Sequence, residues 1–349
     1  MATEPATETT LQGPAAWETE AEQEHVHGMG PWKLGLRRLR RNKVALFFGA
    51  LFILLVLSCL AAPIWADKVA KTTQTENHLS DTITVDGKKK NVVGLDGIPI
   101  GPQWFKADGK FFLGADRNGR DIMVRLLYGG RNSLLIGVVA AFITTILSIV
   151  LGLVSGYFRG PVDTVIRALL DVLWSFPVII LGVALGVALA LGGLKLGPIH
   201  LAGDSLVIPI FIIGIVYVPY MARPVRGQVL SLREKEFVEA ARAQGAGPFR
   251  IMFTEVMPNL ASTVIVFFTL LIANAILLES ALSFLGAGVQ PPNPSWGTMI
   301  DEGVDRIATA PHLTIVPGLM LVLTVLALNV FGDGVRDALD PRAKVRLER

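Results

Sequence analysis

Residues 236–259 read E-F-V-E-A-A-R-A-Q-G-A-G-P-F-R-I-M-F-T-E-V-M-P-N and form the longest clearly polar interval between hydrophobic runs in the second half of the chain. Small and apolar residues recur there at helical spacing, which predicts a short helix with one smooth face. The residues with this spacing are Phe237, Ala240, Ala241 and Gln244. From spacing alone, an ordinary solvated helix–turn–helix loop is the favoured interpretation.

Glycine and proline mark the end of this helix. Gly245 and Gly247 allow a left-handed stop, and Pro248 suits the first turn of a second helix. The small side chains around the stop permit close approach of a partner's backbone. The flanking sequence must therefore show whether this segment docks onto a partner protein or is an ordinary solvated loop.

The flanking sequence is that of a membrane protein. Of 349 residues, 52% are hydrophobic and only 17% are charged, and the apolar residues gather in long uncharged blocks. We therefore expect an all-α polytopic membrane protein with six transmembrane helices. The hydrophobic runs cover roughly residues 44–66, 133–156, 165–191, 206–222, 260–282 and 313–332.

Clusters of Lys and Arg predict the orientation. They precede the first run, lie between runs four and five, and follow run six, whereas the short loops on the other side offer only Lys195 and Arg306. The positive-inside rule then places both termini and the loop at 233–258 in the cytoplasm. The outer loop at 67–131 also carries basic residues, but loops of that length escape the rule. The basic clusters report topology, so no nucleic-acid partner is expected.

These features divide the chain into segments. The first is a disordered acidic tail, and the second holds a basic amphipathic helix whose Leu34 and Leu39 are expected at the lipid interface, with Trp32 as an anchor. The segments are 1–30 (acidic cytoplasmic tail), 31–66 (basic segment and first transmembrane helix), 67–132 (extracytoplasmic loop with an amphipathic helix), 133–335 (five-helix core with the loop 233–258) and 336–349 (basic cytoplasmic tail).

Sequence motifs for catalysis and cofactor binding are missing. The chain has no G-x-x-x-x-G-K-[ST] phosphate loop, no zinc-hydrolase motif and no nucleophile elbow. Its one cysteine, Cys59, excludes an internal disulfide and a multi-cysteine metal site. We expect no catalytic, cofactor or metal site, and if transport is ATP-driven the nucleotide must bind another chain.

Polar residues inside the apolar runs are candidates for the transport pathway. Asp171 follows Arg167 at i, i+4, so an ion pair between them is the alternative to a pathway role. Glu279 either lines the pathway, where it would attract an ammonium group, or hydrogen-bonds between helices. Asn274, one turn earlier, is more typical of a packing contact.

Four segments together resemble the C-type permease of dipeptide/oligopeptide/nickel ABC importers. Glu239-Ala240-Ala241, with Gly245 and Pro258, is similar to the EAA motif of ABC importer permeases. The other three are Gly114-x-Asp116-x-x-Gly119-Arg120-Asp121 with Arg125, Gly129 and Arg131; Leu282 to Gly286 with Pro294 to Gly297; and Pro317-Gly318 with Gly332 to Arg342. The resemblance covers residues 32–343, although Ala115 stands where the family commonly has Thr and the insert at 67–110 looks longer than usual.

This resemblance implies a type I importer permease fold, located in the bacterial inner or plasma membrane. It also implies a second homologous permease, two cytoplasmic ATPases that hold ATP and Mg, and an extracytoplasmic binding protein that delivers di- or oligopeptides. Relatives carry nickel or opines, so these substrates stay open. In a different class, a proton-coupled carrier would use Glu279 or Asp171 as its relay.

Overall fold

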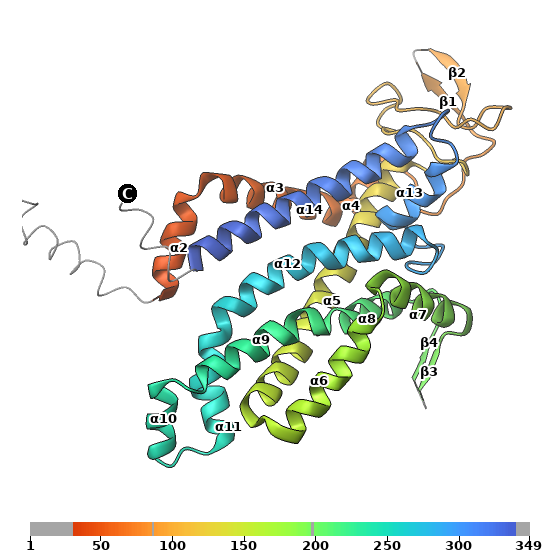
Figure 1. The fold of residues 1–349 in the computed structure, drawn as a ribbon. Helices are drawn as coiled ribbons and strands as arrows, with labels where there is room; N and C mark the ends of the chain where they lie inside the picture. The colour runs from red at the N-terminus through yellow and green to blue at the C-terminus, as the bar shows by residue number, and fades with distance from the viewer. Residues whose placement is uncertain (1–30, 86, 197–198, 340–349) are drawn as a thin grey trace, which may run out of the picture.

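The computed structural model describes residues 31–85, 87–196 and 199–339, which fold into a helical bundle with two short hairpins (Figure 1). The predicted tail at 1–30 lies outside the described residues. So does 340–349 of the predicted C-terminal tail, whereas residues 336–339 continue the last helix. The helices are α2 (Pro31–Arg41), α3 (Lys43–Leu60), α4 (Ala62–Trp65), α5 (Ile122–Phe158), α6 (Gly160–Ser175), α7 (Val178–Gly192), α8 (Val207–Val216), α9 (Val218–Leu232), α10 (Glu236–Ala243), α11 (Pro248–Arg250), α12 (Met257–Phe284), α13 (Trp296–Val304) and α14 (His312–Leu339), with π-helical turns at Ala66–Ala70 and Ile251–Val256.

Within the described ranges, four helical stretches are long and apolar enough to span a membrane. These are Lys43–Leu60, Ile122–Phe158, Pro248–Phe284 and His312–Leu339. Two bent pairs of helices, α6 with α7 and α8 with α9, are also long and apolar enough when each pair is taken as one span. Their bends are 85° and 40°. Counted this way, the structure has the six transmembrane segments that the hydrophobic runs predict.

A proline lies at each of the two breaks. Pro177 stands at the start of α7, and the residue before it, Phe176, is extended at φ −92° and ψ 136°. Proline disfavours the helical region for the preceding residue, so α6 has to end there. Pro219 occupies the first turn of α9, where its missing N–H costs nothing.

Helix α5 is the centre of the bundle, because glycines let its neighbours approach closely. An added Cβ at Gly137 would lie 2.3 Å from Ile276 of α12, and one at Gly152 would lie 2.7 Å from Val225 of α9. Such contacts are too short for any side chain. Helix–helix packing in membranes depends on small residues of this kind.

The loop at 67–132 differs from the prediction. The sequence predicted a separate amphipathic helix before the second run, but residues 122–132 form the first turns of the continuous helix α5, and Ile122, Val124 and Leu126 are buried. The prediction of a separate amphipathic helix is therefore wrong. These turns continue into α5, and other parts of the protein cover their apolar side chains. The insert before them contains an antiparallel hairpin of β1 (Thr82–Val85) and β2 (Lys88–Asn91). A second hairpin joins β3 (Leu194–Leu196) to β4 (Ile199–Leu201).

The bundle has two distinct ends (Figure 1). Helices α10 and α11 lie at one end, here called the α10 end, and α13 with the β1–β2 hairpin lies at the other. Helix α2 packs at the C-terminal end of α14, where a Cβ on Gly35 would lie 3.0 Å from Leu339. Leu34 and Leu39 are half-buried there, so the exposed apolar residues of α2 are Trp32 and Leu36 rather than the predicted leucines.

Candidate functional site

The segment 235–258 folds as a short helix, a turn and a second helix that leads into α12. Lys235 is extended at the start of α10, and Gly245 turns the chain at φ +82°. The N–H of Ala246 donates to the carbonyl of Ala241 at 3.0 Å, which closes the turn. Gly245 is therefore the left-handed stop that the sequence predicted. Gly247 is not, because its φ is −72° and any residue can adopt that conformation.

Helix α10 has one buried side and one exposed side. Val238 is fully buried in the main hydrophobic cluster with Ile251 and Met252, and Ala241 is half-buried against the same cluster. Phe237, Ala240 and Gln244 are exposed. The predicted smooth face is therefore divided, since Ala241 packs inward and the other three residues face outward.

Glu239 belongs to the exposed side as well. Its carboxylate makes no ion pair or hydrogen bond with any other residue that the structure describes, and its backbone N–H donates to the carbonyl of Lys235 at 3.2 Å. Pro258 lies at the start of α12, where it is exposed and compatible with the first helical turn. None of the residues that the structure describes covers the outer side of α10.

Two arginine contacts connect Arg233 and Glu234, which precede α10, to the C-terminal end of α5. The guanidinium of Arg233 donates to the carbonyl of Tyr157 and lies 5.8 Å from the centre of the Tyr157 ring. Arg159 pairs with Glu234 at 2.6 Å, although both side chains are about half exposed. The π-helical turn Ile251–Val256 continues from α11 directly into α12. A displacement of α10 would thus reach both α5 and α12.

The acidic residues of α6 form pairs that spacing did not predict. Asp171 bonds Arg223 of α9 at 2.8 Å, and Arg167 bonds Asp163 at 3.2 Å, so the predicted Arg167–Asp171 pair is wrong. Asp163, buried at 5% exposure, accepts two hydrogen bonds from Arg226 of α9 at 2.6 and 2.7 Å. The sequence reasoning missed this bidentate contact, because the two residues are 63 positions apart and only packing brings them together.

Glu279 and Asn274 lie on different sides of α12. Glu279 is fully buried and accepts a hydrogen bond from the Ser283 hydroxyl at 2.7 Å, with Ser280 at 3.4 Å. Asn274 is half-buried, and its backbone carbonyl accepts from the Tyr217 hydroxyl at 3.3 Å. Counted at 100° per residue, the two positions lie on opposite faces of the helix.

A cavity of about 460 Å³ opens beside the half-buried face of α12. It lies between α9, α12 and α14 and contains hydroxyl, aromatic and aliphatic groups with one charged residue, Arg336. The lining residues are Tyr220, Ser262, Thr263, Val266, Phe267, Leu270, Arg336 and Leu339. Tyr220 also makes edge contacts with Tyr217 and Phe267 at 6.2 and 6.1 Å between ring centres.

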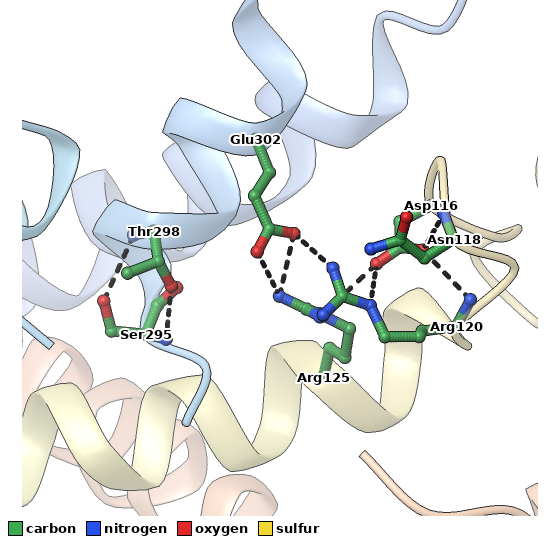
Figure 2. A network of polar contacts seen from close by, with 7 residues as sticks. All are labelled: Asp116, Asn118, Arg120, Arg125, Ser295, Thr298 and Glu302. Carbon is green, nitrogen blue, oxygen red and sulfur yellow. Dashed lines mark hydrogen bonds and ion pairs between the residues drawn. The ribbon is translucent and has the colours of Figure 1, made fainter. Parts of the chain in front are cut away.

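A cluster of ion pairs joins the outer loop to α13 at the end opposite α10 (Figure 2). Glu302 accepts from Arg120 at 2.7 Å and from Arg125 at 2.9 Å, and Arg120 also bonds Asp116 at 2.6 Å. Arg125 is 97% buried, with a side-chain exposure of only 3%, so a charged partner is required beside it. This cluster contains Asp116, Arg120 and Arg125 of the resemblance segment that starts at Gly114, and α13 begins at Trp296 of the segment that includes Pro294 to Gly297.

Two helix caps hold these segments in place. The carboxylate of Asp121 accepts from the N–H groups of Met123 and Val124 at the start of α5, and from the N–H of Phe111 at 2.7 Å. Burial raises the pKa of the Asp121 carboxyl, and these three hydrogen bonds act in the opposite direction. Ser295 and Thr298 form a reciprocal capping box at the start of α13 (Figure 2). Among the described residues, no group of three His, Cys, Asp or Glu side chains is placed to hold a metal ion.

Comparison with known proteins gives a consistent result. The family model for the binding-protein-dependent transport system inner membrane component matches residues 148–345, and that for the N-terminal TM domain of oligopeptide transport permease C matches residues 30–80. The glutathione transport system permease protein GsiD of Pectobacterium atrosepticum is 35% identical over 90% of this chain and 92% of its own length. The di/tripeptide transport system permease protein DppC of Pseudomonas aeruginosa is 36% identical over 90% and 93%.

The solved structures add support for the fold. An inward-facing MetNI methionine ABC transporter chain superposes with a TM-score of 0.52 at 20% identity, and the match covers 63% of this chain and 98% of that one. The match to MetNI supports the fold only, whereas the curated relatives and the family models cover most of the chain. The chain belongs to the binding-protein-dependent transport system inner membrane components, the multi-pass membrane permeases of ABC importers.

Proposed function

We propose that this chain forms half of the translocation pathway of a di- or oligopeptide importer, and that α10 docks onto a cytoplasmic ATPase subunit. The relatives are named as dipeptide, di/tripeptide and glutathione permeases, and all three cargoes are short peptides. The observation that carries the docking proposal is the exposed side of α10, where Phe237, Glu239 and Ala240 are left uncovered by the part of the chain that the structure describes. With α10 and α2 at one end of the bundle, that end is the cytoplasmic one, and both termini lie there.

The proposed partners rest on the family and on the missing phosphate loop. The sequence of this chain has no phosphate loop, so ATP and Mg belong to two ATPase subunits. A second permease completes the pathway, and an extracytoplasmic binding protein delivers the peptide at the β1–β2 end. Ala240 would allow insertion of α10 into the ATPase, Glu239 would supply polar contacts to it, and Ala241 would anchor the helix on the permease core.

The mechanism is a rigid-body relay. ATP binding closes the ATPase pair and displaces α10. Val238 and Ala241 are packed on the core, and Arg233 donates to a backbone carbonyl at the end of α5. Because of these contacts, the movement of α10 is transmitted to α12 and α5. The pathway then opens outward while the binding protein releases its cargo, and hydrolysis resets it.

The half-buried face of α12 is the proposed wall of the pathway. Thr263, Phe267, Leu270 and Asn274 follow one another at i, i+4, i+7 and i+11, and the first three line the cavity. Hydroxyl, amide and aromatic groups on such a wall suit a neutral peptide backbone. Asn274 is thus a proposed pathway residue, whereas Glu279 is fully buried on the opposite face beside Ser280 and Ser283.

The other functions receive less support. A proton-coupled carrier would need a relay of titratable groups, but Asp171 is bonded to Arg223 and exposed, and Glu279 is enclosed by serines. A nickel or opine importer would use the same fold, but the curated relatives cited above are named for peptides.

The test exploits two glycines that differ only in backbone conformation. A Cβ would meet no atom within 4 Å at Gly245 or at Gly247, but φ is +82° at the first and −72° at the second. Gly245→Val should therefore abolish ATP-driven peptide uptake while the chain stays in the membrane, and Gly247→Val should preserve uptake. Normal uptake by the Gly245 variant would refute the coupling role. A pull-down of the tagged chain should recover a second permease and P-loop ATPases, and recovery of the chain alone would refute the importer assembly.

A further inference from the structure

Helix α2 carries a stripe of basic side chains without partners. Lys33, Arg37 and Arg40 recur at i, i+4 and i+7, so they share one face, and Arg41 flanks them. All four side chains are exposed, and none has a carboxylate partner among the residues that the structure describes. The helix itself contains no acidic residue. Its outward face is therefore a site of positive charge for which the described residues supply no acidic partner.

Apolar side chains border this stripe. Trp32 and Leu36 are each 52% exposed and, at helical spacing, lie directly beside Lys33 and Arg40. The opposite side of the helix, with Gly35 and Leu39, packs towards α14. The free surface of α2 thus combines cations with an indole and a leucine, immediately before the first transmembrane helix.

We propose that this surface is a binding site for anionic phospholipid in the cytoplasmic leaflet. Phosphate head groups would pair with the basic stripe, while Trp32 and Leu36 would insert at the boundary with the acyl chains. The acidic segment at 1–30 could neutralise the charges, but it holds few large apolar residues to cover Trp32 and Leu36. An anionic lipid supplies both kinds of contact.

The site is mechanically linked to the proposed pathway. A Cβ on Gly35 would lie 3.0 Å from the Leu339 side chain and 3.4 Å from the Ala338 carbonyl, so α2 and the end of α14 are in direct backbone contact. Leu339 and Arg336 line the 460 Å³ cavity. Lipid bound to α2 would hold the cytoplasmic mouth of that cavity in place. This regulatory part rests on the proposed permease function, whereas lipid binding does not.

The first experiment measures binding alone. The full chain, assembled with its partner subunits, is titrated with phosphatidylglycerol and with phosphatidylcholine, and retained lipid is counted by native mass spectrometry. Each charge near a membrane surface contributes about fivefold to the preference for anionic lipid, so Lys33→Gln/Arg37→Gln/Arg40→Gln should lose roughly a hundredfold of it. The matched control, Lys88→Gln/Lys89→Gln/Lys90→Gln, removes equal charge from exposed positions of β2 and should lose none.

Two further variants separate charge from structure. Arg37→Lys/Arg40→Lys/Arg41→Lys keeps the charge and should keep the preference. Gly35→Val should keep lipid binding but make ATP-driven uptake insensitive to phosphatidylglycerol, because α2 can no longer rest on α14. ATP-dependent uptake that is the same in phosphatidylglycerol and in phosphatidylcholine membranes would overturn the regulatory part. The proposed importer function would be unaffected by that result.

The lipid site is overturned if the wild-type chain shows no preference for phosphatidylglycerol, or if the β2 control loses as much as the α2 variant. A preference that emerges only after residues 1–30 are removed would also overturn it, since that result assigns the basic face of the intact chain to the acidic tail.

Discussion

The guanidinium of Arg125 lies 2.9 Å from the carboxylate of Glu302, although 177 residues separate the two in the chain. Arg125 belongs to the first turn of α5, and Glu302 belongs to α13. Their contact fastens the helix at the centre of the bundle to the short helix that closes the opposite end from α10 (Figure 2).

Removing the Glu302 carboxylate should leave the buried Arg125 guanidinium without its closest charged partner. Glu302→Ala leaves Arg125 with only Asp116 at 3.4 Å, and breaking a buried pair costs about 3–5 kcal/mol. The Glu302→Ala/Arg125→Met double variant should be more stable than the single one. Thermal unfolding in detergent measures both, and additive effects in the double variant would contradict the pairing.

The two acids of α6 should differ sharply. Asp163→Asn weakens a buried bidentate contact with Arg226 and should cost about 1.5–3 kcal/mol, because hydrogen bonds between charged groups have that strength. Asp171→Asn removes an exposed pair and should cost under about 1 kcal/mol. Denaturation of the two purified variants side by side tests this order, and equal losses would refute it.

The exposed side of α10 should matter for coupling and not for folding. Ala240→Leu enlarges an uncovered residue, so expression and thermal stability should stay at wild-type level while co-purification of the ATPase and ATP-driven uptake fall. Ala184→Leu is the control, since Ala184 is an exposed helical alanine in α7. Retention of the ATPase by the Ala240 variant would show that α10 docks elsewhere.

The two faces of α12 should respond differently in transport. Asn274→Trp narrows the proposed pathway and should block peptide uptake in vesicles. Glu279→Gln keeps an oxygen for the Ser283 hydroxyl and should leave ATP-driven uptake intact, with no response to a protonophore. Uptake that collapses with the protonophore and survives ATP depletion would favour the proton-coupled carrier.

Local chemistry explains what the sequence predicted correctly. Hydrophobic runs specify spans because a helix in lipid must satisfy its backbone internally and cover itself with apolar side chains. The positive φ at Gly245 and the helix start at Pro248 follow from the residues themselves. The resemblance motifs also identified the family from local sequence, because each motif lies within one or two short stretches of the chain.

Tertiary structure decided which residues meet. The partner of Asp171 is Arg223 and not the nearby Arg167, because α9 packs beside α6 and brings a second cation within 2.8 Å. Whether Glu279 faces a cavity or a serine cluster depends on how α12 is rotated against its neighbours, and Ala241 packs inward on the same side as the buried Val238. Helical periodicity defines which residues share a face, but only the packing of neighbouring helices determines what that face contacts.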